Sequence, residues 1–362
     1  MKKSKLLLAV LGTVAGAASA QSSVTMFGVV DLSLRYVNND ASTYQLAQDG
    51  MAASRLGFRG SEDLGGGLRA GFWLEGALGP DTGTGSNSFG NGGGPTGTTN
   101  AFEFRRRSTV SLSNQWGEIR LGRDYTPTFW NIGVYDPFGL QGVGSAGNVF
   151  VSAEIRGIAG AAGAYGTLVR ANNSVQYILP NGIFGPGLYG QVMVAAGEGA
   201  PANKYFGGRV GYAAGAFDVA AAYGTTDVDV AGNVKLDNWN IGGSWNFGLL
   251  KLSGFYGSMD LGGLAAGDVK QDNWFVGISA PIAQWNLKAS YGQVKQGGIV
   301  DGNKANQFAV GADYNLSKRT AVYATYGAIQ NTDTAYSVSA SGSPLTRGTN
   351  SNGAEFGIRH AF

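Results

Sequence analysis

Apolar and polar residues alternate along many short segments of this chain, which is the pattern of strands. From Val24 to Tyr36, apolar residues at every second position oppose polar ones, with Phe27 and Val29 as exceptions, and the alternation returns around Trp239 and Trp285. A period of two places the two sets on opposite faces of a strand. No apolar run reaches the roughly 18 residues that a membrane-spanning helix needs. If the chain enters a membrane, it does so with strands.

The first twenty residues have the features of a secretory signal peptide, which leaves residues 21–362 as a single domain. Lys2, Lys3 and Lys5 precede a mainly apolar run that ends in the small residues Ala18-Ser19-Ala20. Without these three lysines, the 26 basic residues fall to 23 against 24 acidic ones, so any charge preference has to be local. The chain has no cysteine, which excludes disulfides and thiol chemistry.

About sixteen segments have the alternating pattern, and an even number suits antiparallel closure. Tight connections such as 61–67, 113–117, 280–284 and 315–319 alternate with long ones such as 37–50, 78–100 and 329–351. Short turns on one rim and long loops on the other are typical of an outer-membrane barrel. The predicted strands start near residues 24, 51, 68, 101, 116, 170, 187, 204, 217, 234, 249, 270, 284, 305, 319 and 352.

The predicted fold is therefore all-β, a transmembrane antiparallel β-barrel, with a soluble β-sandwich as the alternative. Aromatic residues beside the tight turns favour the barrel, because they would form an interfacial girdle. They are Trp116, Tyr212, Phe217, Trp245, Phe247 and Trp285. The last strand, which ends at Phe362, is expected to close against the first, because lipid does not tolerate an open edge. Sixteen strands enclose too wide a space for side chains to fill, so the interior holds water.

One connection is much longer than the others, with about 45 residues between Arg123 and Arg170. It contains Asp136 and Glu154 and is rich in glycine and alanine. Two interpretations stay open at this point. The segment could form an extracellular flap, or it could fold into the lumen and narrow it, since small residues let its backbone lie close to the wall.

Several stretches resemble the trimeric general porins of Gram-negative outer membranes, most closely the anion-preferring porins of betaproteobacteria. The match covers essentially the whole mature chain. The stretches are Ser22–Asp31, Ser54–Gly65, Arg106–Leu112, Gly117–Arg123, Arg170–Val175 and Gly357–Phe362.

The resemblance implies a homotrimer of sixteen-stranded barrels, each with its third loop folded inward opposite a set of arginines. In this chain the arginines fall on Arg55, Arg106 and Arg170, and the acidic partners on Glu75 and Asp124. Alternation places Arg55 and Arg170 toward the lumen. It disagrees for the third position, where parity with Val110 and Leu112 turns Arg105 and Arg107 inward instead of Arg106.

The function expected from these features is passive diffusion of small hydrophilic solutes and ions, with a preference for anions. Further basic residues on the inward phase are Arg35, Arg59, Lys251 and Lys288. A pore specific for small organic acids is the alternative, and the expected surroundings are outer-membrane lipid and lipopolysaccharide. The sequence does not identify the transported solutes.

Other classes of function find little support in the sequence. An outer-membrane hydrolase would need a nucleophile and a base, yet the one histidine, His360, lies in phase with the apolar residues of the last strand. An adhesin or structural barrel is the remaining alternative. No cofactor, no metal and no nucleic-acid partner is expected, although loop carboxylates could hold a calcium ion.

Overall fold

The computed structural model describes residues 23–85, 102–150, 155, 167–180, 182–198, 204–228, 233–340 and 342–362. The predicted signal peptide and Glu154 lie outside these ranges. Within them, no helix is long and apolar enough to cross a membrane. The helical elements are the α-helix α2 (Pro127–Tyr135) and the 3-10 helix η1 (Ala146–Val149). The strands are β1 (Ser23–Asn38), β2 (Ser42–Gln48), β3 (Arg55–Gly65), β4 (Leu68–Gly79), β5 (Thr84–Gly85), β6 (Arg107–Asn114), β7 (Gly117–Tyr125), β8 (Arg170–Leu179), β9 (Leu188–Ala195), β10 (Tyr205–Ala214), β11 (Phe217–Asp227), β12 (Lys235–Asn246), β13 (Lys251–Gly262), β14 (Val269–Ile282), β15 (Trp285–Gly298), β16 (Lys304–Asn315), β17 (Thr320–Thr332) and β18 (Ser351–Ala361).

These strands form a closed antiparallel barrel with sixteen strand positions. β3 pairs with the first half of β1 and β2 with its second half, so β2 and β3 share one position in the wall. β5 is a two-residue strand paired only with the end of β4. β18 pairs with β1 from Val29↔Ala361 to Asn38↔Asn352, which closes the barrel. The all-β barrel, its strand number and the closure of the last strand on the first are thereby confirmed.

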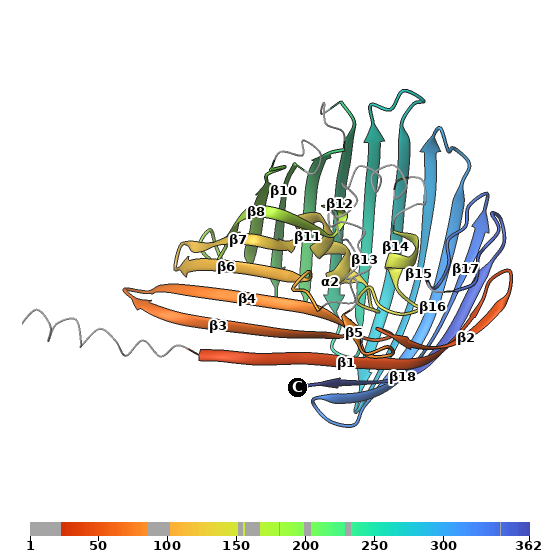
Figure 1. Cartoon of the computed structure of the whole chain (residues 1–362), viewed down its shortest axis with the longest axis horizontal. Helices are drawn as coiled ribbons and strands as arrows, with labels where there is room; N and C mark the ends of the chain where they lie inside the picture. The colour runs from red at the N-terminus through yellow and green to blue at the C-terminus, as the bar shows by residue number, and fades with distance from the viewer. Residues whose placement is uncertain are drawn as a thin grey trace, which may run out of the picture.

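The strands are strongly tilted around the barrel. In Figure 1, β1 and the strands from β3 to β8 run across the view, whereas β10 to β17 run nearly up it. Tilt of this kind is required to close a sheet into a barrel, because the hydrogen-bond register has to shift around the wall.

The two faces of the wall differ in polarity. Trp239, Ile241 and Trp285 alternate with buried or inward residues and are about half exposed, as side chains that face lipid would be. Inward positions instead hold polar residues such as Asn240 and Lys288. The six aromatic residues beside the tight turns are all exposed. The outer face is therefore apolar and the inner face polar, as in other barrels that cross a membrane.

The segment 126–150, which follows β7, lies against the polar face of the wall. Gln307 of β16 donates from Nε2 to the Ser145 carbonyl at 2.8 Å, and Gln271 of β14 donates to the Phe150 carbonyl at 2.6 Å. The backbone N–H of Val143 donates to Glu355 of β18 at 3.0 Å. Gln307 and Glu355 are each followed by an exposed phenylalanine, Phe308 and Phe356, so the segment contacts the face of the wall opposite to the apolar one.

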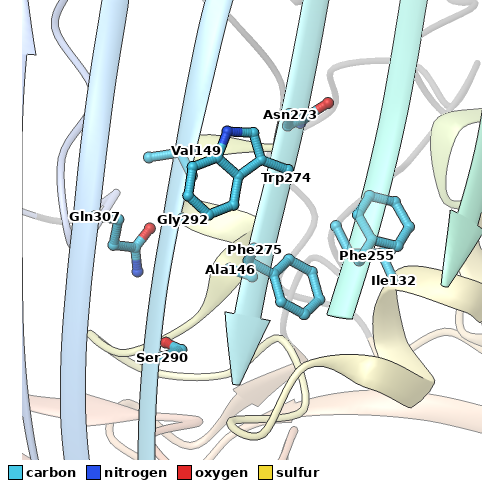
Figure 2. Close-up of a pocket in the computed structure, with 10 residues that line it drawn as sticks. All are labelled: Ile132, Ala146, Val149, Phe255, Asn273, Trp274, Phe275, Ser290, Gly292 and Gln307. Atoms are coloured by element: carbon cyan, nitrogen blue, oxygen red, sulfur yellow. The ribbon is translucent and has the colours of Figure 1, made fainter. Parts of the chain in front are cut away.

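Apolar packing adds to these hydrogen bonds. Figure 2 shows Ile132 of α2 and Ala146 of η1 near Phe255 and Phe275, which come from neighbouring strands. The two phenylalanine rings stack with centroids 5.3 Å apart. Burial of such side chains stabilises the contact by roughly 1.5–3 kcal/mol each. One face of the segment is thus fixed to the wall, and its other face is left toward the lumen.

Two strand boundaries differ from the prediction. The strand expected near residue 51 begins at Arg55, and an extra strand, β2, precedes it. The gap between them arises because the Asp31 carboxylate accepts the backbone N–H groups of Met51 and Ala52, at 2.9 and 2.6 Å. These donors cannot then pair in the ladder. The strand expected near residue 101 begins at Arg107.

Candidate functional site: a basic hollow in the lumen

The predicted arginines meet around one carboxylate. Glu75 lies on the inward phase of β4, and its Oε1 accepts Arg106 Nε at 2.5 Å. Arg55 Nε, from the start of β3, is 3.9 Å from the same oxygen. The indole N–H of Trp73 donates to Oε2 at 3.1 Å. A single carboxylate therefore holds two guanidinium groups in place, and one positive charge of the cluster is left uncompensated.

Tyr125, at the end of β7, joins the third arginine to this cluster. Its hydroxyl accepts Arg106 Nη2 at 2.9 Å and Arg170 Nη2 at 2.6 Å. The Arg170 guanidinium also lies over the tyrosine ring, 4.2 Å from its centroid. Arg170 is only 3% exposed, so solutes in the lumen do not contact its guanidinium group directly.

The structure explains why alternation disagreed with the assignment of Arg106. The ladder between β4 and β6 begins at Glu75↔Arg107, so Arg106 precedes the regular strand and its orientation is not bound by the period of two. Arg106 and Arg107 both line the same hollow. Arg105 instead forms an ion pair with Glu103.

A hollow of about 580 Å³, the basic hollow, lies between these strands and segment 126–150. One side is charged, with Arg55, Arg59, Arg106, Arg107 and Glu75, a net charge of +3. Arg59 lies over the rings of Phe27 and Trp73, 5.3 and 5.1 Å from their centroids, and Arg107 is 4.5 Å from the Trp73 ring. The other side is apolar. Its residues are Phe129, Trp130, Val134 and Leu140.

Asp124 lies apart from Glu75, although the resemblance grouped them. Its Oδ2 accepts Arg120 Nη1 at 2.6 Å and is 3.4 Å from Arg107 Nε. Three arginines, Arg59, Arg107 and Arg120, line a second hollow near the tight-turn rim, together with serine and threonine residues and Glu118, which pairs with Arg120 at 2.9 Å. The basic lining therefore continues from the basic hollow along the inner wall.

Two of the other predicted basic residues are neutralised by ion pairs. Arg35 is buried and paired with Glu355 at 2.8 Å, and Lys288 is buried and paired with Asp313 at 2.8 Å. Arg59 lines both hollows. Lys251 is on the inward phase at the start of β13, where it is partly exposed.

Asp136 of segment 126–150 turns its carboxylate into the segment itself. It accepts the backbone N–H groups of Phe138, Leu140 and Ala146 at 3.1, 2.9 and 3.1 Å. Burial raises the pKa of Asp136 despite these hydrogen bonds and despite nearby Lys288. The carboxylate thus shapes the turn after α2 and does not offset the arginines of the basic hollow.

Within the described ranges, little supports other kinds of functional site. No three His, Cys, Asp or Glu side chains there gather into a group that could hold a metal ion. His360 is exposed on β18, with its Nδ1 2.9 Å from Thr320 Oγ1.

Sequence reasoning missed several residues of the site. Tyr125, Trp73 and Arg120 were not predicted. Arg107 was considered only because the alternation with Val110 and Leu112 turns it inward. Alternation could have indicated Trp73 and Arg120, since both share the inward phase of their strands. No sequence signal could have found Tyr125, because its role depends on arginines from two other segments.

Comparisons with known proteins agree with this architecture. The family model described as Gram-negative porin matches residues 7–334. The chain is 40% identical to outer membrane porin protein 32 of Delftia acidovorans, over the full length of both. The anion-selective porin from Comamonas acidovorans has a TM-score of 0.80 and 36% identity, covering 94% of this chain and 100% of that one. OmpT of Vibrio cholerae shares the fold, with a TM-score of 0.67 at 17% identity over 94% of this chain and 99% of that one. The chain therefore belongs to the Gram-negative porin family and is an outer-membrane β-barrel channel.

Proposed function

We propose that this porin is an anion-preferring diffusion channel whose selective part is the basic hollow. The observation that carries the proposal is the charge of its lining, where four arginines face one glutamate. The similarity to a porin described as anion-selective supports the same preference. Small hydrophilic solutes would cross by diffusion, with no energy source and no covalent step.

Segment 126–150 is proposed to narrow the channel at this level. Hydrogen bonds to β14, β16 and β18 fix it to the inner wall, and its apolar side chains face the arginines across the basic hollow. Solutes then pass within reach of the guanidinium groups. A wider channel would let them pass through bulk water, where the same charges act more weakly.

The expected preference is moderate. At about 6 Å in a water-like dielectric, one charge pair contributes roughly 0.7 kcal/mol, so a net charge of +3 contributes about 2 kcal/mol before screening. That favours an anion over a neutral solute by at most a factor of about thirty, and screening by salt lowers this factor. The attraction is weak enough for the anion to leave again.

Neutralising the two arginines that share Glu75 tests the proposal. The double variant Arg55→Gln/Arg106→Gln removes two charges and leaves Glu75 unpaired, so the hollow should lose most of its anion preference. The net charge of the lining falls from +3 to +1, so the reversal potential across a planar bilayer under a KCl gradient should shift from the chloride side toward zero. Lys318→Gln, in the exposed turn between β16 and β17, is the matched control and should leave the potential unchanged. An unchanged potential in the double variant would refute the assignment.

We propose in addition that three copies assemble in the outer membrane, surrounded by its lipid and lipopolysaccharide. Membership in the porin family supports this assembly. Chemical cross-linking in native membranes should give a species of three times the monomer mass. A product no larger than a monomer would contradict the assembly without affecting the proposed selectivity.

A further inference from the structure

The basic hollow has two chemically different sides, and only the charged side attracts simple anions. Arg55 and Arg106 share the single carboxylate of Glu75, so their guanidinium groups can donate hydrogen bonds to a second carboxylate. Guanidinium groups match carboxylates in shape and charge. Chloride or phosphate would need nothing more than this charged side.

The other side exposes apolar side chains inside a water-filled channel. α2 buries Ile132 and Tyr135 on the wall, whereas Phe129, Trp130 and Val134 line the hollow. Val134 is 37% exposed. A segment that only narrowed an aqueous channel would expose polar residues there, because exposed apolar area costs roughly 25 cal/mol per Å². Apolar surface gathered in a concave site is typical of ligand binding.

The aromatic side chains are held in fixed positions. Phe129 stacks on Tyr125 with centroids 5.1 Å apart and planes 6° apart, and Trp130 meets the same ring at 5.3 Å, edge to face. Tyr125 is in turn fixed by Arg106 and Arg170. The apolar and basic sides are therefore joined through one residue. A planar ring entering the hollow meets ordered aromatic faces and edges, which favour stacking or edge-to-face contact.

We propose that the solute class for which this channel is selective is the aromatic monocarboxylates, of the size of benzoate. The carboxylate lies toward Arg55 and Arg106, and the ring lies toward Phe129 and Trp130. The hollow, at about 580 Å³, lies within the roughly 300–1,000 Å³ typical of small-molecule pockets, and the weak attraction of its charges lets the solute leave again. This inference rests on the proposed anion channel and names its preferred solute.

Block of chloride current tests the inference. Sodium benzoate is compared with sodium acetate, which has the charge without the ring, and with cyclohexanecarboxylate, which has an apolar ring without π electrons. The half-blocking concentration of benzoate should be about three- to tenfold lower than that of either, from the added aromatic contact. Equal block by benzoate and acetate, or by benzoate and cyclohexanecarboxylate, would overturn the proposal.

Variants locate the effect in the hollow. Trp130→Ala should reduce the benzoate-to-acetate difference, each measured relative to the variant's own chloride current. Trp116→Leu, an exposed aromatic beside a tight turn, is the matched control and should keep the full difference. If both variants keep it, the proposed site is wrong. Failure of this inference is separable from failure of the proposed function, because a chloride reversal potential with no benzoate effect contradicts this inference alone.

Discussion

Tyr125 is the residue on which the geometry of the site depends most. Its hydroxyl accepts hydrogen bonds from two arginines, and its ring contacts Arg170 on one side and Phe129 by stacking. Hydrogen bonds to charged donors contribute more than neutral ones, and a buried donor left without its acceptor is costly. Tyr125 thus positions Arg106 and Arg170, although the charge that solutes meet belongs to the four arginines that line the basic hollow.

Removing this hydroxyl should weaken the barrel. Tyr125→Phe keeps the ring contacts but takes one acceptor from Arg106 and from the buried Arg170, so we expect a loss of about 1 to 3 kcal/mol in the free energy of unfolding. Denaturant unfolding of the folded barrel in lipid vesicles measures it. Tyr326→Phe, 42% exposed on the outer face of β17, should change it by less than about 0.5 kcal/mol. Equal effects of the two variants would contradict the role of Tyr125.

At the scale of elements, segment 126–150 fits the wall because wall glycines leave room for it. A Cβ on Gly242 of β12 would overlap the Tyr135 ring, and one on Gly277 of β14 would overlap Pro137. On Gly327 of β17 it would overlap the Val143 carbonyl. These three strands thus lack side chains where the segment crosses them, which lets the wall donate hydrogen bonds to its backbone.

A side chain at one of these positions should displace the segment. Gly327→Ala places a methyl group against the backbone of Val143, which cannot rotate away, so the segment should move toward the lumen and lower the single-channel conductance. The strain should also cost about 1 to 3 kcal/mol of stability. Gly254→Ala is the control, since its Cβ would have its nearest neighbour at 3.9 Å. Matching conductances for the two variants would show that the segment does not narrow the channel.

The strands could be predicted from the sequence, whereas the site could only be predicted in part. Alternation gives strand positions because each inward residue has exposed apolar neighbours, as around Trp239. It failed before β6 because Phe102 and Phe104 continue the alternation, although their rings contact each other outside the strand. The glycines opposite the segment have no recognisable pattern, since their role depends on residues about 100 to 200 positions away. The periodicity likewise does not indicate that Arg35 pairs with Glu355 or that Lys288 pairs with Asp313.

For the whole molecule, selectivity depends on local charge in a nearly neutral chain. The 26 basic and 24 acidic residues of the chain almost cancel, and the inward Arg35 and Lys288 are neutralised by buried partners, whereas the basic hollow keeps a net charge of +3. Because the lumen holds water, this field is screened by salt, and the Debye length falls from about 10 Å at 0.1 M to 3 Å at 1 M. The preference should therefore weaken as the salt concentration rises.

The most direct test is the reversal potential of the unmodified protein in a planar bilayer, under about tenfold KCl gradients whose lower concentration is near 0.01 M or 0.1 M. A closed, water-filled barrel with a basic hollow should carry a stable ionic current. Its reversal potential should have the sign of the chloride equilibrium potential and should be smaller under the gradient with the higher salt concentrations. A potential with the sign of potassium, or the absence of any current from folded protein, would contradict it.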